Sequence, residues 1–450
     1  MRPEGVWMRR LVYLYFFLLI FEGALRKWIV PSLAAPLLVI RDPVLLGIYA
    51  MALSRGSFPW NRWVMTAVGL CVASMMASVA VGCPLTITLF GVRTDFWQIP
   101  LIFLMPLILS REEVRRIGRW TLMIMPGMAV LALAQFRVGP EHWLNATTGG
   151  SMSEQSQQLY AAAGRVRPSG TFSFVTGMVS FLVLGSAFVF EAFLEERALK
   201  RLWIATGAMV LALGISGSRS AILGVGIVAG AAVLMCVENP RRLRKVATPL
   251  VAAALAYALL HGLSDFRAGL DVNKDRFAGA GGLKEGILYR WFGDFVSAWQ
   301  SEQQAPWLGS GLGMGTSVGA GLATGTRQFL LAEGEWARVI LESGPVLGVA
   351  FIALRLGIAA MLLGRALRAL QERDDALPML LLAAGMMDLV MGQWGQATVS
   401  GFAVFIAGLC LASGSDEGDA EPEMQQVGPP ITRRLRGRSV YAETIKGQRG

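Results

Sequence analysis

The chain has 450 residues, of which 54% are hydrophobic and only 16% are charged, and its mean hydropathy is +0.51. These values lie outside the range of soluble globular proteins and predict a polytopic membrane protein. The net charge of +10 would suit a nucleic-acid-binding protein, but the basic residues are distributed in a way that argues against that class.

Apolar windows long enough to cross a bilayer as helices recur along the chain. We expect about 12 spans, near residues 9–24, 34–53, 63–82, 97–110, 120–137, 173–193, 202–215, 219–236, 246–262, 336–363, 377–392 and 396–412. The predicted fold class is therefore all-α, a polytopic transmembrane helix bundle over residues 1–412. Long outer connections are expected at about 138–172 and, as a large loop between spans 9 and 10, at 263–335.

Basic residues gather in alternate connections between these windows. If the N-terminus is inside, the inside segments contain Arg2, Arg9, Arg10, Arg55, Arg62, Arg111, Arg115, Arg116, Arg119, Arg197, Lys200, Arg201, Arg241, Arg242, Arg244, Lys245, Arg365, Arg368 and Arg373. The outside connections are poor in Lys and Arg, except for the two long ones. This positive-inside pattern predicts that both termini are cytoplasmic and that no nucleic acid is bound.

The two ends of the chain and the cysteines add further expectations. The first apolar run lacks a small-residue cleavage site, so we expect a retained anchor. Residues 413–450 are polar, first acidic and then basic, which predicts a disordered cytoplasmic tail that touches anionic lipid. The four cysteines have no paired spacing and there are two histidines, so neither a disulfide framework nor a metal site is indicated.

The second long loop carries two distinctive stretches. In "GILYRWFGDFVSAW" (286–299) the aromatic residues share one helical face, which suits a helix at the membrane interface, a lid, or ordinary loop packing. In "PWLGSGLGMGTSVGAG" (306–321) the alternating glycines would expose backbone N–H groups to an anion. We expect no dinucleotide site there, because no βαβ pattern surrounds it.

Ionisable residues also lie near the predicted outer ends of the spans. They are Arg165, Arg167, Arg219, Arg290, Glu333, Glu335 and Arg338. Several guanidinium groups around a partly dry cavity would bind a diphosphate, and a nearby carboxylate would take a proton from an attacking hydroxyl.

Each of these residues also has a simpler interpretation. In "GISGSRSAIL" (214–223), Arg219 would reach the headgroups from a hairpin. Arg167 would be a solvated loop charge, and Glu335 would be favoured by the dipole of the first turn of span ten. Glu342 would be a buried structural carboxylate paired with an arginine. Taken together, the residues favour the cation-lined outer cavity.

Four motifs follow one another in a characteristic order. They are "RPSGTF" (167–172), "SGSRSAILG" (216–224), "RW…PWLGSGLG" (290–313) and "EGEWARVILESGPVLG" (333–348). With the span count and the large late loop, this order resembles the O-antigen ligase/polymerase superfamily. The earlier "FEGALRKWIVP…RDPVLL" resembles a feature of a subgroup, and no chemistry attaches to it.

The resemblance implies a membrane glycosyltransferase of the bacterial inner membrane that needs no metal, cofactor or nucleotide sugar. Its donor would be an undecaprenyl-diphosphate-linked glycan, and its acceptor a hydroxyl of a glycan or lipid at the periplasmic face. This is the chemistry of O-antigen, capsule or exopolysaccharide assembly, with polysaccharide-assembly proteins as further partners. By position, Arg219 would bind the donor diphosphate, with Arg167 and Arg290 in support.

The chain departs from the family at one point. Members commonly carry His-Asn where this sequence has Glu333-Gly334. Either Glu333 or Glu335 replaces the histidine as base, with Arg338 and Glu342 in support, or the acceptor chemistry differs, or the enzyme is degenerate. The departure favours a polymerase or exopolysaccharide member over a lipid A ligase.

Three other functions fit parts of the sequence. A lipid-linked glycan flippase or another 12-span transporter has a similar span count, but it should place its charges in a cavity open to both sides. A non-catalytic scaffold needs none of the motifs. A metal-dependent glycosyltransferase would use an acidic pair in an outer loop, for which "EGE" (333–335) is the candidate.

Overall fold

The described part of the computed structural model comprises residues 3–147, 165–195, 199–238, 243–278, 306–325, 331–332 and 334–414, with 293 and 296–297 as isolated residues. These residues are helical, with no β-strand among them beyond one bridge residue at Val166, so the all-α class is confirmed. Arg290, Glu333, the predicted helix at 286–299 and nearly all of the predicted tail at 413–450 lie outside the described residues.

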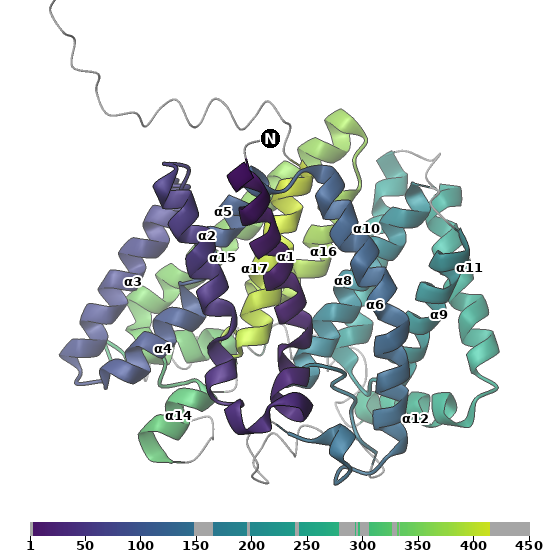
Figure 1. The fold of residues 1–450 in the computed structure, drawn as a ribbon, viewed down its shortest axis with the longest axis horizontal. Coiled ribbons are helices and arrows are strands. Elements are labelled where there is room, and N and C mark those ends of the chain that lie inside the picture. The colour runs from purple at the N-terminus through teal and green to yellow at the C-terminus, as the bar shows by residue number, and fades with distance from the viewer. Residues whose placement is uncertain are drawn as a thin grey trace, which may run out of the picture. The chain divides into compact units, whose positions relative to one another are not determined.

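The described residues form fifteen α-helices (Figure 1). The helices are α1 (Pro3–Ala24), α2 (Arg41–Ser54), α3 (Arg62–Ala80), α4 (Leu85–Asp95), α5 (Ile99–Ile108), α6 (Arg111–Arg137), α8 (Val175–Leu194), α9 (Leu199–Ile215), α10 (Arg219–Glu238), α11 (Leu243–Leu260), α12 (Ser264–Ala278), α14 (Ser317–Thr324), α15 (Glu335–Arg373), α16 (Leu377–Val390) and α17 (Ala397–Gly414). Single turns complete the connections: a π-helical η1 (Leu25–Ile29) and the 3-10 turns η2 (Pro31–Leu33), η3 (Pro36–Val39) and η4 (Trp143–Asn145).

Eight of the described helices are long and apolar enough to cross a membrane. They are Pro36–Ser54, Arg62–Ala80, Arg111–Arg137, Val175–Leu194, Arg219–Cys236, Leu243–Leu260, Glu335–Arg373 and Ala397–Gly414. The pair α4 and α5, bent by 40°, would be a ninth span. These helices make the chain a membrane protein, whereas the count of 12 spans stays a prediction.

The fourth predicted span was incomplete. The window at 97–110 contains α5, but the structure adds α4 before it, in a stretch that the sequence had assigned to an outer connection. Leu85–Asp95 is weakly apolar because it ends in Arg93 and Asp95, and the chain breaks before Pro100. The break therefore places Asp95 inside the bundle, where it is 2% exposed.

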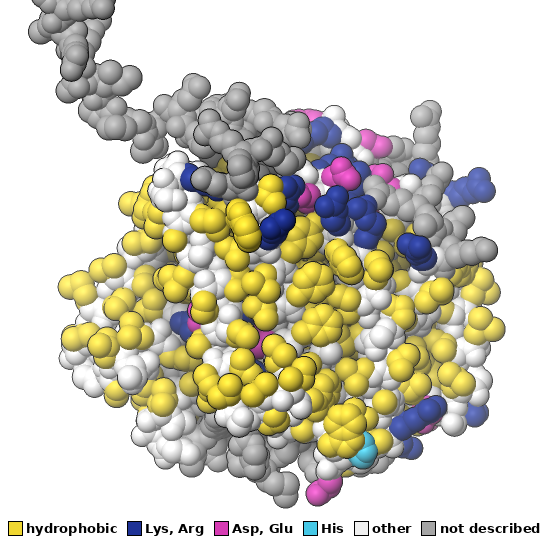
Figure 2. All heavy atoms as spheres, viewed as in Figure 1, with side chains coloured by type: hydrophobic (Ala, Val, Ile, Leu, Met, Phe, Trp, Pro, Cys, Tyr) yellow, Lys and Arg dark blue, Asp and Glu magenta, His cyan; other side chains and the backbone are white. Residues whose placement is uncertain are grey.

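The predicted inside segments meet at one end of the bundle, which we call the basic end. Their contacts are Arg9 with Glu113, Arg55 with Met8, Arg111 with Asp375, Arg115 with Glu191 and Glu195, Lys245 with the carbonyl of Leu194, and Arg373 with the carbonyl of Gly414. Figure 2 shows Lys and Arg side chains gathered where α1 begins. The contacts agree with placement on one side of the membrane, and its cytoplasmic identity stays a prediction.

The opposite end, which we call the loop end, holds η1, η4 and α12 (Figure 1). Trp28 packs edge-on against Trp143, with ring centroids 6.5 Å apart, and Arg137 pairs with Asp265 at 2.7 Å. Between the two ends, α8 and α17 are the innermost of the candidate spans, since 89% of each is buried.

Candidate functional site

The first arm of α15 carries three charged side chains on one face. Glu335, Arg338 and Glu342 follow at intervals of three and four residues, which brings them together on a helix. The arm ends at Gly344, whose φ of 79° and ψ of 166° are not helical, and Pro345 begins the second arm. Each of the three residues is at most 4% exposed.

The kink at Gly344 folds the first arm back along the second. The Nη1 atom of Arg355 lies 2.6 Å from Oε1 of Glu335, although twenty residues of straight helix would separate them by about 30 Å. Arg355 lies about 15 Å along the second arm. Glu335 does begin α15, as predicted, but it lies within the bundle and not at the surface where span ten was expected to start.

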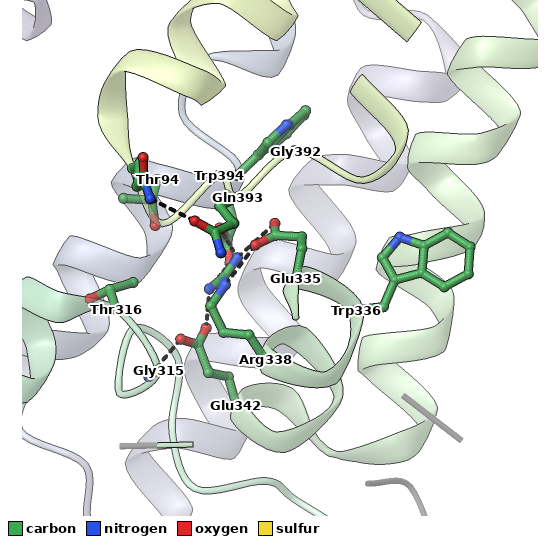
Figure 3. A network of polar contacts seen from close by, with 12 residues as sticks. Thr94, Gly315, Thr316, Glu335, Trp336, Arg338, Glu342, Gly392, Gln393 and Trp394 are labelled. Atoms are coloured by element: carbon green, nitrogen blue, oxygen red, sulfur yellow. Dashed lines mark hydrogen bonds and ion pairs between the residues drawn. The ribbon is translucent and has the colours of Figure 1, made fainter. Parts of the chain in front are cut away.

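Five buried groups form what we call the α15 cluster: Asp95, Glu335, Arg338, Glu342 and Arg355. Arg338 lies between its acidic partners (Figure 3), with Nε 2.9 Å from Glu335, Nη2 2.9 Å from Asp95 and Nη1 2.7 Å from Glu342. Three carboxylates thus face two guanidinium groups, at distances of 2.6–2.9 Å. Exposure ranges from 0% to 4% across the cluster.

The guanidinium group of Arg355 is also fully engaged. It lies 4.3 Å above the ring of Trp394 and donates to the carbonyls of Leu389 at 2.8 Å and Gly392 at 3.0 Å. Trp394 belongs to the turn at residues 391–396 between α16 and α17. The 14 residues of α16 rise only about 21 Å, which is short of a bilayer core of about 30 Å, so this turn lies inside the bundle.

These contacts decide the structural roles of three predicted site residues. Glu342 is buried and paired with Arg338, which agrees with the simpler interpretation of this residue as a structural carboxylate. Both oxygens of Glu335 accept from arginines, which favours a structural role, while its catalytic role stays a prediction. The structure brings Glu335, Arg338 and Glu342 together, and their charges are satisfied by the protein itself.

The glycine-rich run at 306–321 does not form an anion site. Its N–H groups donate within the protein: Ser310 to the carbonyl of Leu341, Gly311 to the carbonyl of Glu342, Leu312 to Oγ of Ser78, and Gly315 to Oε1 of Glu342. A Cβ on Gly309 would lie 2.2 Å from the carbonyl oxygen of Glu342. The glycines therefore permit close packing against the kink of α15, and the expectation of exposed N–H groups was wrong.

The "RPSGTF" motif belongs to a turn before α8, residues 165–174, which we call the motif loop. Lys27 in η1 donates to Oγ of Ser169 at 3.1 Å and to the carbonyl of Gly170 at 2.8 Å. Arg26 donates to Oγ of Ser173 at 3.1 Å. The early "FEGALRKW" segment, to which the sequence attached no chemistry, thus holds the motif loop in place.

The docking of the motif loop depends on close contact and on burial. A Cβ on Gly23 would lie 2.3 Å from the backbone nitrogen of Ser173, so only glycine fits there. Lys27 is 5% exposed, and burial lowers its pKa to about 7. Arg41 pairs with Glu22 at 2.8 Å and donates to the carbonyl of Ala397 at 2.6 Å, which joins α1 and α2 to α17.

Arg219 occupies a different environment at the start of α10. It is partly exposed, and none of the described carboxylates pairs with it. The helix leaves the loop end, because the preceding Gly214 accepts from Asn273 of α12 at 2.8 Å. No hydrogen bond or ion pair among the described residues joins Arg219 to the α15 cluster, so the structure keeps these two predicted groups separate.

The depth of Arg219 follows from the packing of α10 on α8. Both helices run from the loop end to the basic end (Figure 1), and they touch where Gly224 meets Val183. Counting back five residues in each helix places Arg219 level with Met178. Thr176 and Ser180 lie on either side of that level. Arg167 is also partly exposed, in the motif loop next to α8.

Two further contacts at this level had not been predicted. Oγ of Ser180 donates to Oδ2 of Asp388 at 2.5 Å, and Oγ1 of Thr176 donates to Oε1 of Gln396 at 2.8 Å. Asp388, like Arg355, stands within an apolar run, and an isolated charge in such a run is itself a signal of function. The sequence interpretation missed Asp388 and Arg355, because it considered ionisable groups only near the outer ends of spans.

Comparison with known protein families and with curated proteins found no match to this chain. The family resemblance therefore rests on the four motifs and the predicted topology. Among the described residues, no three His, Cys, Asp or Glu side chains are grouped so that they could hold a metal ion. The three carboxylates of the α15 cluster instead surround a guanidinium group, and the expectation of metal-independent chemistry stays a prediction.

Proposed function

We propose that the chain is a membrane glycosyltransferase that transfers or polymerises glycan from an undecaprenyl-diphosphate-linked donor onto a sugar or lipid hydroxyl. The loop end would face the periplasm and the basic end the cytoplasm, in the inner membrane of a bacterium, with both termini cytoplasmic. The contacts that gather the basic residues at one end support this orientation.

The environment of Arg219 carries the proposal. It combines a partly exposed guanidinium group that has no described acidic partner with the start of a helix, where backbone N–H groups also favour an anion. A guanidinium group binds two phosphate oxygens at once. Arg167 lies near the start of the neighbouring α8 and would add to the positive potential, and Arg290 is proposed as a third donor contact.

The reaction would be a displacement at the anomeric carbon. The acceptor oxygen forms a bond to that carbon while the bond from carbon to the diphosphate oxygen breaks, and the electron pair leaves with the diphosphate. Arg219 would stabilise the negative charge that develops there, a contribution that is often the largest in such catalysis. The acceptor proton must pass to a base.

The test is the cell-surface glycan of a deletion strain complemented with wild type, Arg219→Ala or Arg219→Lys. We expect Arg219→Ala to abolish polymer and Arg219→Lys to lose at least about tenfold, because lysine keeps the charge but loses the planar fork. Arg267→Lys, an exposed arginine of α12 at the same end, is the matched control and should restore polymer fully.

The same strains separate the transferase from a flippase. In the deletion strain, a missing transferase leaves the lipid-linked glycan at the periplasmic face, whereas a missing flippase leaves it at the cytoplasmic face. Full-length polymer from Arg219→Ala would contradict the donor site. Inhibition by EDTA that a divalent ion reverses would favour metal-dependent transfer instead.

A further inference from the structure

Asp388 in α16 differs from the other buried carboxylates of the bundle. It is partly exposed, and among the described residues it forms no ion pair. Its Oδ2 atom accepts from the hydroxyl of Ser180, and its Oδ1 atom accepts no hydrogen bond from the described side chains. Arg355 donates to the backbone carbonyl of Asp388 at 3.5 Å but forms no ion pair with its side chain. A carboxylate outside an ion pair keeps one oxygen for a further contact.

The carboxylates of the α15 cluster and Glu22 differ from Asp388, because each of them is held in a buried ion pair. Glu335 and Glu342 are at most 1% exposed and accept from guanidinium groups at 2.6–2.9 Å. Glu22 pairs with Arg41 at 2.8 Å. An acceptor hydroxyl could reach none of these without first breaking a buried ion pair, which is strongly destabilising.

Asp388 and Arg219 lie on helices that pack against one another. Asp388 is bonded to Ser180, which lies one half-turn from the level of Arg219 on the neighbouring α8. Helix α10 packs against both α8 and α16, so Arg219 at the start of α10 and Asp388 in the last turn of α16 belong to helices that meet one another. No ion pair joins them, so each is left to meet a ligand group.

We propose that Asp388 is the catalytic base of this protein, which accepts the proton of the acceptor hydroxyl; this inference rests on the proposed function. The proton passes to Oδ1 as the acceptor oxygen bonds to the anomeric carbon and the diphosphate leaves toward Arg219. Protonated Asp388 then returns the proton to water. Ser180 is a positioning residue, because its hydroxyl fixes the other carboxylate oxygen.

The experiment compares Asp388→Asn with wild type in two measurements on detergent-purified, full-length protein and its membranes. The first is the affinity for undecaprenyl diphosphate, and the second is the rate of glycan formation in membranes of the complemented deletion strain. We expect Asp388→Asn to lose about 10²- to 10³-fold in rate while its affinity changes less than threefold. Asp388→Glu should recover part of the rate.

Two controls and the pH profile separate a base from a structural carboxylate. Asp265→Asn, which removes a loop-end carboxylate paired with Arg137, should leave the rate within threefold of wild type. Ser180→Ala keeps the carboxylate and should keep more than a tenth of the rate. The acid limb of the wild-type pH profile should be absent from the residual activity of Asp388→Asn.

The outcomes are distinguishable. If wild type neither binds undecaprenyl diphosphate nor restores glycan, the proposed function fails and the inference fails with it. If wild type does both and Asp388→Asn keeps its rate within threefold, the function stands and Asp388 is not the base. Parallel loss of melting temperature, affinity and rate in both Asp388→Asn and Asp388→Glu would make the residue structural and would also overturn the inference.

Discussion

The α15 cluster and the start of α10 both place arginine in apolar surroundings, and they use it in opposite ways. In the cluster, Arg338 meets three carboxylates within 2.9 Å and is 4% exposed. At α10, Arg219 is partly exposed and has no described acidic partner. A charge that the protein itself saturates holds helices together, whereas a charge left unsaturated is available to a ligand.

This difference separates two kinds of mutational effect. Removing one member of a buried ion pair leaves its partner uncompensated, so stability and activity should fall together in the cluster. Removing Arg219 or Asp388 leaves no buried charge unpaired, so activity should fall while the fold persists. Measuring melting temperature and glycan formation on the same variants therefore tests the comparison directly.

The largest effect is expected for Arg338→Met, which keeps the length of the side chain but leaves Asp95, Glu335 and Glu342 without their shared guanidinium group. Breaking a buried pair costs about 3–5 kcal/mol, and we expect a loss of at least that size. Thermal unfolding in detergent measures it. Arg365→Met, at an exposed position further along α15, is the control and should unfold like wild type.

Glu335→Gln sharpens the comparison, because the residue was also predicted to be a catalytic base. Its side-chain oxygens accept from Arg338 and Arg355, so we expect a loss of about 1–3 kcal/mol in the free energy of unfolding, with glycan formation reduced in parallel. Glu112→Gln, exposed in the first turn of α6, is the control. Loss of activity at an unchanged melting temperature would instead support catalysis by Glu335.

Gly23→Ala tests whether the motif loop must be held in place. The added Cβ would lie 2.3 Å from the nitrogen of Ser173, so the loop or α1 must shift. We expect glycan formation to fall about tenfold or more, with a destabilisation of about 1–3 kcal/mol from overpacking. Gly5→Ala, in the same helix with open space around it, should change neither quantity. Equal behaviour of the two variants would contradict the positioning role.

Lys27→Met is expected to have the smallest effect near neutral pH, because its consequence is a change in the pH dependence of stability above pH 7. The folded-state pKa of about 7 lies below the unfolded value of about 10.4. Between these values the unfolded chain binds more protons, so the free energy of unfolding of wild type rises with pH across that window. In Lys27→Met this contribution is absent, and the melting temperature should rise less between pH 7 and 10.

The exposed Lys274 of α12 gives the matched variant, Lys274→Met, whose pH dependence should equal that of wild type. Identical slopes for Lys27→Met and wild type would mean that Lys27 is not buried as the structure has it. Because the lysine bonds only to uncharged groups of the motif loop, its removal should affect glycan formation less than Gly23→Ala does.

Apolar periodicity predicted a large part of the fold, and it could not predict where helices bend. A helix lies in each of the twelve predicted windows. The break between α4 and α5 and the fold-back of α15 were missed, because a window average does not register a local turn. The Gly344-Pro345 pair was a signal for the second of these.

The candidate site was less predictable, because its residues meet across long stretches of chain. Lys27 and Ser169 are 142 residues apart, and nothing local to "FEGALRKW" indicates that it docks on "RPSGTF". Glu342 and Arg338 could be paired from helical spacing. Arg355, Asp95 and Asp388 required three-dimensional packing to place, although charge within an apolar run marked Arg355 and Asp388.

The ion pair between Asp95 and Arg338 has a consequence for biosynthesis. The two residues are 243 positions apart. Because synthesis starts at the N-terminus, Asp95 leaves the ribosome long before Arg338 has been synthesised. A nascent chain that ends before Glu335 also lacks both guanidinium groups of the α15 cluster. The bent pair α4–α5 can thus reach its final charge balance only after most of the polypeptide has been synthesised, which makes closure of this region one of the last steps of assembly.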